Sequence, residues 1–298
     1  MTESYEPFLI GVDGGGTGCR AALARGNGQI LAQVEGGRAN VATDFDLAVK
    51  NVAEVIANVA GKGGIGQSNS KAVSIHVGLA GVISKAVSRK VAEALPYALI
   101  TVTDDRVVAV KGALGDDDGY FMSVGTGTIV ASKKAGELHN VSGWGFAVSD
   151  QASGAWLGRR LLEKTLLCYD RIQPHTELTL ATLARFEGDP NELVAFSLGA
   201  KPGDFGAFAP DVMHAAKAGD QIGLELTNEG ADYLQSALRA LSFDKGDRLC
   251  VSGGVGKHYL PYLNAKFKEN VIDPDGPPIE GALRLAAEAM HARAKVAS

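Results

Sequence analysis

The stretch Phe8–Gln33 constrains the fold of this chain most, because its apolar runs place a glycine turn between two strands. Phe8–Val12 is a short apolar run, which predicts a strand buried on both faces. Cys19–Ala24 is again strand-like, Asn27-Gly28 is a strong hairpin signal, and residues 30–34 form a returning strand. The sequence therefore predicts three consecutive strands, with the glycine turn between the first two.

Asp13 ends the first apolar run, and the turn that follows can direct several backbone amides and one hydroxyl at a single spot. The turn consists of Gly14, Gly15, Gly16 and Thr17. A Walker A loop carries Lys-Ser/Thr after its glycines and opens a helix, and a dinucleotide-binding fingerprint also opens a helix. Neither pattern follows here, and a glycine run alone marks a plain turn more often than a phosphate site.

A second copy of the pattern favours the phosphate site. Tyr120–Val141 reads as strand, tight turn, strand, turn and strand, and its tight turn consists of Gly125, Thr126, Gly127 and Thr128. Two copies of one supersecondary unit indicate two similar halves that face each other, with a nucleotide held by its phosphates between the two turns. Two unrelated hairpins in an α/β protein remain the alternative.

Size and charge narrow the class of protein. A chain of 298 residues, 46% of them hydrophobic, can bury a large core and is long enough to form two domains. The net charge is −5, and acidic and basic residues are interspersed. The sequence has no cluster of positive charge that would attract nucleic acid or an anionic membrane, so we expect small-molecule partners.

The cysteines and the N-terminal residues indicate a cytoplasmic protein. Cys19, Cys168 and Cys250 are far apart and lack metal-site spacing, which predicts reduced core thiols. Met1–Pro7 is polar, and no apolar run approaches the roughly 20 residues that a bilayer requires. The oligomeric state stays open, with a homodimer as one option.

Polar residues stand at the ends of several predicted elements. Asn40 precedes a predicted helix and is either a turn former or an amide donor to a polyhydroxyl ligand. Thr103-Asp104-Asp105 follows a strand, at the end where ligands bind in open α/β sheets. One aspartate is expected to cap the helix that follows, which leaves the second for chemistry. Trp144 and Asp150, singly a core aromatic and a helix cap, together outline a polar pocket with an aromatic wall.

These motifs resemble the sugar-kinase branch of the superfamily that joins actin, heat-shock chaperones and hexokinase. The likeness is to its N-acetylglucosamine kinases and BadF/BadG-type ATPases. The matching segments come in the family's order over nearly the whole chain: GVDGGGT at 11–17, TDD at 103–105, GTGT at 125–128, GWG with SDQASG at 143–154, and SGGVG at 252–256. The resemblance implies an α/β fold of two ribonuclease H-like lobes, an actin-like ATPase fold, with a nucleotide cleft between them. The implied N-terminal lobe is 1–105, completed by the helix 282–298, and the C-terminal lobe is 106–281.

The resemblance also implies a reaction, the transfer of phosphoryl from ATP to the 6-hydroxyl of an amino sugar. Asp105 would be the general base, with an ordinary pKa of about 4. Asp13 would orient Mg²⁺ through water. The phosphates would be held by the turns 14–17 and 125–128, and the adenosine by Gly253 and Gly254. The sugar would be held by Asn40, Gly143, Trp144 and Asp150.

Within the family the likeness is greatest to bacterial glucosamine kinases, at 173–176, 204–206 and 279–282. Two positions depart from the family pattern. Asp104 stands where relatives usually have Thr or Asn, which leaves the choice of base open between two carboxylates. Gln151 stands where the animal enzymes have Glu. Whether the sugar amine is free or acetylated also stays open.

Two other functions use the same fold. Iron–sulfur activator ATPases need cysteines that hold a cluster at a dimer interface, and the spacing of Cys19, Cys168 and Cys250 does not suit one. A nucleotide- or sugar-sensing protein without turnover is the third option. The sequence offers no convincing helix-turn-helix segment or basic patch for it.

Overall fold

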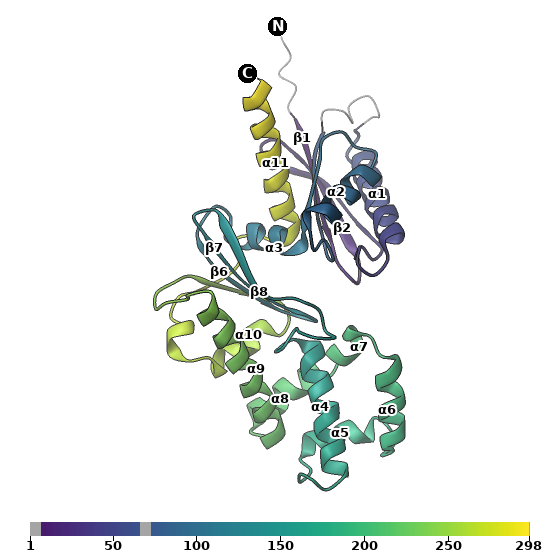
Figure 1. Cartoon of the computed structure of the whole chain (residues 1–298), viewed down its shortest axis with the longest axis vertical. Helices are drawn as coiled ribbons and strands as arrows, with labels where there is room; N and C mark the ends of the chain where they lie inside the picture. Colours follow the sequence, from purple (N-terminus) through teal and green to yellow (C-terminus); the bar gives the residue numbers. More distant parts are fainter. Residues whose placement is uncertain (1–6, 66–72, 298) are drawn as a thin grey trace. The chain divides into compact units, whose positions relative to one another are not determined.

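The computed structural model describes residues 7–65 and 73–297 (Figure 1). Most of the N-terminal polar segment 1–7, and residue 298 of the expected last helix, lie outside these ranges. The chain divides into two compact units, residues 1–116 with 274–298, and residues 117–273. Across the described residues, no helix is long and apolar enough to cross a membrane.

The first unit is built on a five-stranded mixed sheet in the order β3-β2-β1-β4-β5. Its strands are β1 (Phe8–Gly14), β2 (Cys19–Arg25), β3 (Ile30–Gly36), β4 (Val73–Leu79) and β5 (Ile100–Asp104). The first three strands are antiparallel, and β4 and β5 continue the sheet parallel to β1. The predicted strands on either side of the first glycine turn are therefore confirmed.

Helices pack on both faces of this sheet. They are α1 (Phe45–Lys62), α2 (Lys85–Ala94), α3 (Asp105–Leu114) and α11 (Pro278–Ala297). Alternate residues of β1 point to opposite faces, so Ile10 joins the cluster that includes α1, whereas Leu9 packs with Leu283 of α11. A Cβ atom at Gly11 would lie 2.8 Å from the Leu283 amide nitrogen, so this glycine lets α11 approach the sheet closely.

The helix α3 belongs to the first unit because it packs tightly against α11. A Cβ atom at Gly281 would overlap the carbonyl oxygen of Val108, so the two helices touch through backbone atoms. The first unit accordingly runs to residue 116 and resumes at residue 274, whereas the boundaries expected from the sequence are residues 105 and 282.

The second unit has a sheet of the same topology, in the order β10-β9-β6-β7-β8. Its strands are β6 (Gly119–Val124), β7 (Thr128–Lys134), β8 (Glu137–Ser142), β9 (Leu249–Ser252) and β10 (Val271–Ile272). Again three antiparallel strands come first, and two parallel strands follow. The repeat predicted from the sequence is confirmed as a repeat of topology.

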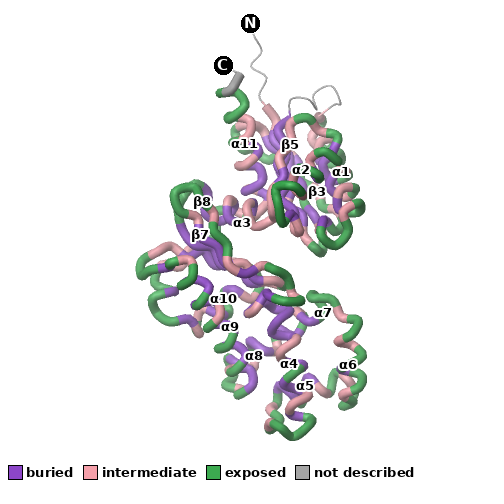
Figure 2. The backbone as a smooth tube through the Cα atoms, in the orientation of Figure 1, coloured by how far each residue is buried: buried purple, intermediate pink, exposed green. Residues whose placement is uncertain are grey.

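Helices make up the rest of the second unit. They are α4 (Gly154–Tyr169), α5 (Glu177–Ala184), α6 (Pro190–Gly199), α7 (Pro202–Gly206), α8 (Ala209–Ala218), α9 (Gln221–Ala240) and α10 (Gly256–Tyr259), with 3₁₀ turns at Leu260–Tyr262 and Ala265–Phe267. Figure 2 shows buried residues concentrated on the strands and on the inner sides of these helices.

One expectation for this part of the chain is wrong. The sequence predicts an irregular link at 205–210 and one or two helical turns at 210–218. The structure confirms this helix, α8, but has α7 ending at Gly206 and α8 beginning at Ala209, so the link is shorter than predicted. Pro202 and Pro210 fall in the first turns of the two helices, where the missing amide hydrogen costs nothing. The prolines therefore start helices here rather than interrupt them.

Candidate active site

The first glycine turn is fixed by hydrogen bonds to the loops beside it. The Ala80 amide donates to the Gly14 carbonyl at 2.8 Å, and the Ala39 amide donates to the Gly15 carbonyl at 2.9 Å. Gly14 is required by packing, since a Cβ atom there would lie 2.9 Å from the Ala39 Cβ. Gly16 has an ordinary negative φ, and a Cβ atom there would meet nothing within 4 Å. The space left open at Gly16 lets a ligand approach the backbone directly.

Asp13 stands at the end of β1, beside this turn, in a polar cavity of about 360 Å³. The cavity is lined by Asp13, Gly15, Thr17, Gly18, Cys19, Arg20, Glu35 and Gly36. Burial raises the pKa of Asp13, and the positive charge of Arg20 partly offsets this. A cation in the cavity would favour the ionised carboxylate. The described residues contain no cluster of three metal-ligating side chains, so a metal here would be held by Asp13 together with water or phosphate oxygens.

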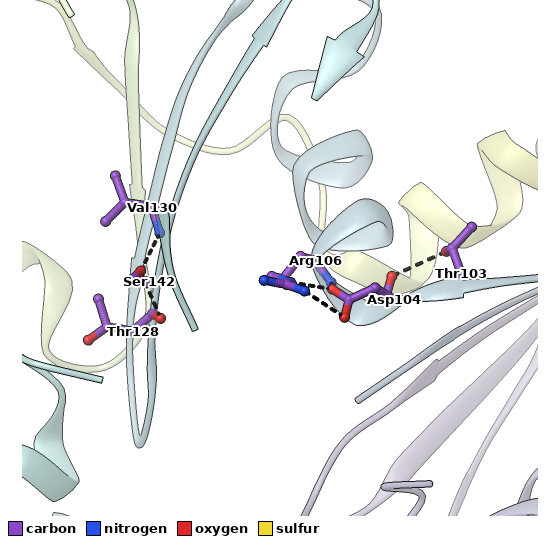
Figure 3. A network of polar contacts seen from close by, with 6 residues as sticks. All are labelled: Thr103, Asp104, Arg106, Thr128, Val130 and Ser142. Carbon is purple, nitrogen blue, oxygen red and sulfur yellow. Dashed lines mark hydrogen bonds and ion pairs between the residues drawn. The ribbon is translucent and has the colours of Figure 1, made fainter. Parts of the chain in front are cut away.

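The two aspartates at the end of β5 have different partners. Asp104 caps α3, its Oδ1 accepting from the Arg106 amide at 2.9 Å. The same carboxylate pairs with the Arg106 guanidinium, at 2.5 Å to Nε and 3.0 Å to Nη2 (Figure 3). Asp105 is the first residue of the helix. The capping role thus falls to Asp104, which leaves the Asp105 carboxylate for chemistry.

The pKa of Asp105 is raised to about 7, first by burial and then by the charge and hydrogen bond of Asp104. Asp13 also raises it, and Arg106 lowers it. The sequence leads us to expect an ordinary carboxylate pKa, whereas in the structure the Asp105 carboxylate gains its proton near neutral pH. The influence of Asp13 on this pKa indicates that the Asp105 carboxylate lies near the first glycine turn.

The side-chain oxygen of Asn40 stabilises the turn that follows it. Its Oδ1 accepts from the backbone amides of Ala42 at 2.9 Å and Thr43 at 3.2 Å. Gly81 has a φ of +85°, and a Cβ atom there would lie 2.6 Å from the Asn40 oxygen. The structure therefore shows Asn40 as a turn former. Donation from its Nδ2 to a ligand remains a prediction.

The second glycine turn lies on the N-terminal end of α4. The Gly154 amide donates to the Gly125 carbonyl at 2.7 Å, and the Ala155 amide donates to the Thr126 carbonyl at 3.3 Å. Ser142 holds the far end of the turn, because its hydroxyl donates to the Thr128 carbonyl at 3.2 Å and accepts from the Val130 amide at 3.2 Å (Figure 3). Gly125, like Gly16, faces open space.

Asp150 lies directly against this turn. A Cβ atom at Gly127 would be 3.0 Å from Asp150 Oδ2. Burial raises the pKa of Asp150, and hydrogen bonds with the Gly145 and Thr128 backbones lower it. Within the described part of the chain, Asp150 Oδ1 and Thr128 Oγ1 are buried and have no hydrogen-bond partner. Both oxygens are therefore free to interact with a hydroxyl-bearing ligand.

Trp144 lies on an exposed loop that follows β8, between Gly143 and Gly145, which have φ values of +75° and +96°. Its side chain is 73% exposed. The structure therefore presents this indole to solvent, where a sugar ring can stack on it. Its role as the aromatic wall of a pocket remains a prediction.

Gly125, Thr126 and Gly254 line one cavity of about 660 Å³ in the second unit. Its remaining wall comes from Gly154, Gly203, Gly206, Ala209, Pro210, Met213, His214, Lys217, Val255 and His258. Gly253, next to Gly254, packs closely against β6. Its φ is +83°, and a Cβ atom there would overlap the Val124 carbonyl oxygen. Sequence reasoning missed the residues of α8 and α10, for which the sequence carries no signal beyond ordinary helical patterning.

A second cavity in this unit, of about 690 Å³, is less suited to a ligand. Its Asp220 accepts from the amides of Leu178 and Gly223, and its Asp211 pairs with Arg185 at 2.9 Å. These carboxylates therefore stabilise helix starts and contacts between helices.

Two sheets of one topology, each with a glycine turn after its first strand, define an α/β protein of the actin-like ATPase fold. The chain belongs to the BadF/BadG/BcrA/BcrD ATPase family, which it matches over residues 10–286. It is 32% identical over 285 residues to the glucosamine kinase GspK of Vibrio cholerae, covering 95% of this chain and 97% of the relative.

Solved structures agree with this assignment. A candidate N-acetylglucosamine kinase from Chromobacterium violaceum superposes with a TM-score of 0.85 at 30% identity, covering 94% of this chain and 99% of the other. A ROK family glucokinase from Streptomyces griseus, solved with glucose and AMPPNP, gives a TM-score of 0.58 at 18% identity, covering 94% and 98%. The latter bears on the fold alone. The fold and the family predicted from the sequence are confirmed.

Proposed function

We propose that this protein is an ATP-dependent kinase that phosphorylates the 6-hydroxyl of an amino sugar, glucosamine or N-acetylglucosamine. The relatives of about 30% identity over nearly the whole chain support this class of substrate. The observation that carries the proposal is the separation of roles between Asp104 and Asp105. Arg106 and the helix amide engage Asp104, so Asp105 remains as a base near Asp13 and the first glycine turn.

Asp105 accepts the proton of the sugar 6-hydroxyl as its oxygen bonds to the γ-phosphorus, while the bond from that phosphorus to the β–γ bridging oxygen breaks and ADP leaves. Phosphoryl transfer demands mainly positioning and charge neutralisation from the protein. The amides of the turns 14–17 and 125–128 bind phosphate oxygens, and Gly253 and Gly254 take the adenosine side. Asp13 would hold the Mg²⁺ ion that accompanies ATP, and this ion would supply positive charge to neutralise the phosphates. Asp13 orients the metal, and the open space at Gly16 and Gly125 admits the phosphates to the backbone.

The sugar is held by donors and acceptors that the protein leaves unused. Asp150 Oδ1 accepts from a sugar hydroxyl, which satisfies a buried atom that otherwise lacks a partner. Asn40 Nδ2 donates to another hydroxyl. Gly143 and Gly145 shape the loop that presents Trp144 to the ring.

We expect Asp150→Ala and Asn40→Ala to raise the sugar KM, about 100-fold and about tenfold respectively. The first removes a charged acceptor, and the second removes a neutral donor. Initial-rate kinetics at saturating ATP measure both. An unchanged sugar KM in both variants would remove these residues from the sugar site.

The pH dependence follows from the raised pKa of Asp105. A general base must be ionised, so kcat/KM should fall as the pH drops below about 7 and level off above it. Asp104→Asn removes the neighbouring charge and hydrogen bond, and should move this acid limb to lower pH. The shift is partial because burial, the largest cause, remains. The role of Asp105 as the base would be contradicted if kcat/KM fell only near the ordinary carboxylate pKa. It would also be contradicted if Asp104→Asn left the pH of this fall unchanged.

A coupled assay for ADP tests the proposed function, with glucose, glucosamine, N-acetylglucosamine, N-acetylmannosamine and N-acetylmuramic acid as acceptors. We expect ADP with glucosamine or N-acetylglucosamine and little with the others. ADP that forms at one rate regardless of sugar would indicate an ATPase of another kind. The iron–sulfur alternative gains no support from the cysteines, because Cys19, Cys168 and Cys250 are all buried.

A further inference from the structure

The segment that carries Asp150 is held in a conformation that its residues disfavour. Asp150 has a φ of +62°, and Ala152, two residues later, has a φ of +68°. Asparagine and aspartate tolerate the left-handed region, but alanine does so at a cost, because its Cβ crowds the backbone. Ala152 is fully buried. Its conformation must therefore be imposed by contacts with other elements.

One contact is a hydrogen bond from a buried tyrosine. The hydroxyl of Tyr259, the last residue of α10, donates to the Ala152 carbonyl at 2.9 Å. Tyr259 is fully buried, and burial, with a smaller effect of Glu229, raises its pKa well above the ordinary value. The hydroxyl therefore stays protonated, and remains a donor, throughout the neutral range.

The helix facing Tyr259 makes room for this hydroxyl. Gly230 lies within α9, and a Cβ atom there would overlap the Tyr259 hydroxyl oxygen. Glycine is unfavourable inside a helix, so its presence here is explained by the space that the phenol needs. The Ala152 carbonyl therefore accepts from a buried tyrosine hydroxyl, and Gly230 provides the space for that hydroxyl.

We propose that Tyr259 is a positioning residue that holds Ala152 in its left-handed conformation, and thereby directs the Asp150 carboxylate towards the bound sugar. The proposal rests on the sugar-binding role given to Asp150. Asp150 and Ala152 are separated by one residue, so a change of backbone conformation at Ala152 redirects Asp150. The second glycine turn has anchors other than this contact, because the Gly154 and Ala155 amides that hold it belong to α4, and the Val255 amide donates to the Val124 carbonyl at 2.9 Å.

Tyr259→Phe tests the proposal, because it keeps the ring and removes only the hydroxyl. We expect the dissociation constant of the amino sugar, measured by calorimetry, to rise about tenfold, as for a buried carbonyl that loses its donor. We expect kcat and the dissociation constant of ADP to stay within about twofold of the wild-type values, since neither Asp105 nor the nucleotide turn is touched. Tyr262→Phe is the matched control, since the Tyr262 hydroxyl makes no hydrogen bond within the described residues, and it should leave sugar binding unchanged.

The variant Ala152→Gly tests whether Tyr259 acts through the backbone conformation of Ala152 rather than through packing alone. Glycine adopts the left-handed region without cost, so Tyr259→Phe should weaken sugar binding less than about threefold in the Ala152→Gly background. Two results would overturn the proposal. One is a sugar dissociation constant within twofold of wild type in Tyr259→Phe. The other is an equal loss in both backgrounds, which would mean that Tyr259 does not act through Ala152.

Amide hydrogen exchange provides a readout that needs no substrate. Exchange in a peptide covering residues 149–155 should be faster in Tyr259→Phe than in wild type, and unchanged in Tyr262→Phe. If the wild-type protein binds no amino sugar, the proposed function fails, while this measurement still decides whether Tyr259 holds the segment. Equal exchange in all three proteins would refute that role.

Discussion

Asp105→Asn should lower kcat by about two to four orders of magnitude, the usual contribution of a positioned general base. The amide is nearly isosteric and keeps the first residue of α3, so the helix start and the Asp104–Arg106 pair should persist. ATP binding should change little, because the phosphate contacts come from the glycine turns. Rapid-quench measurement of kcat, together with calorimetry for ADP, separates the two effects.

Asp104→Asn is the matched comparison. Asparagine also caps helices, so α3 should keep its start, and kcat at high pH should fall by less than about tenfold. The opposite result, near-normal turnover in Asp105→Asn with turnover lost in Asp104→Asn, would assign the base to Asp104.

Asp13→Asn should lower kcat/KM for MgATP about 100-fold, the scale of a lost metal-orienting carboxylate. The midpoint of the Mg²⁺ titration should rise in parallel, since the neutral amide no longer attracts the metal. Asp46→Asn is a suitable control, because Asp46 is exposed in the first turn of α1 in the same unit. A normal Mg²⁺ midpoint in Asp13→Asn would remove Asp13 from the metal site.

The sequence predicts most of the fold because its strongest signals are local. The glycine turns at 14–17 and 125–128 lie between runs with strand periodicity, and the structure has strands on both sides of each. The sequence does not predict the short helix α7, because a proline that opens a helix, as Pro202 does, and one that ends a helix look alike without tertiary contacts.

The roles of the site residues are harder to predict. They depend on contacts with residues distant in sequence, or on which residue begins a helix. Asp104 and Asp105 are indistinguishable until the first residue of α3 and the position of Arg106 are known. The raised pKa of Asp105 depends mainly on burial, which a three-residue motif does not reveal. Likewise, Tyr259 reaches Ala152 across 107 positions of the chain, and no local pattern marks the pair.

The fate of the γ-phosphoryl group decides whether this protein phosphorylates an amino sugar. Wild-type protein is incubated with γ-labelled ATP, Mg²⁺ and glucosamine or N-acetylglucosamine, and the labelled products are separated. We predict that the label appears in a hexosamine 6-phosphate, in amounts equal to the ADP formed, and that Asp105→Asn slows its appearance by about two to four orders of magnitude. Label that appears only as inorganic phosphate, at the same rate with and without the sugar, would contradict the account.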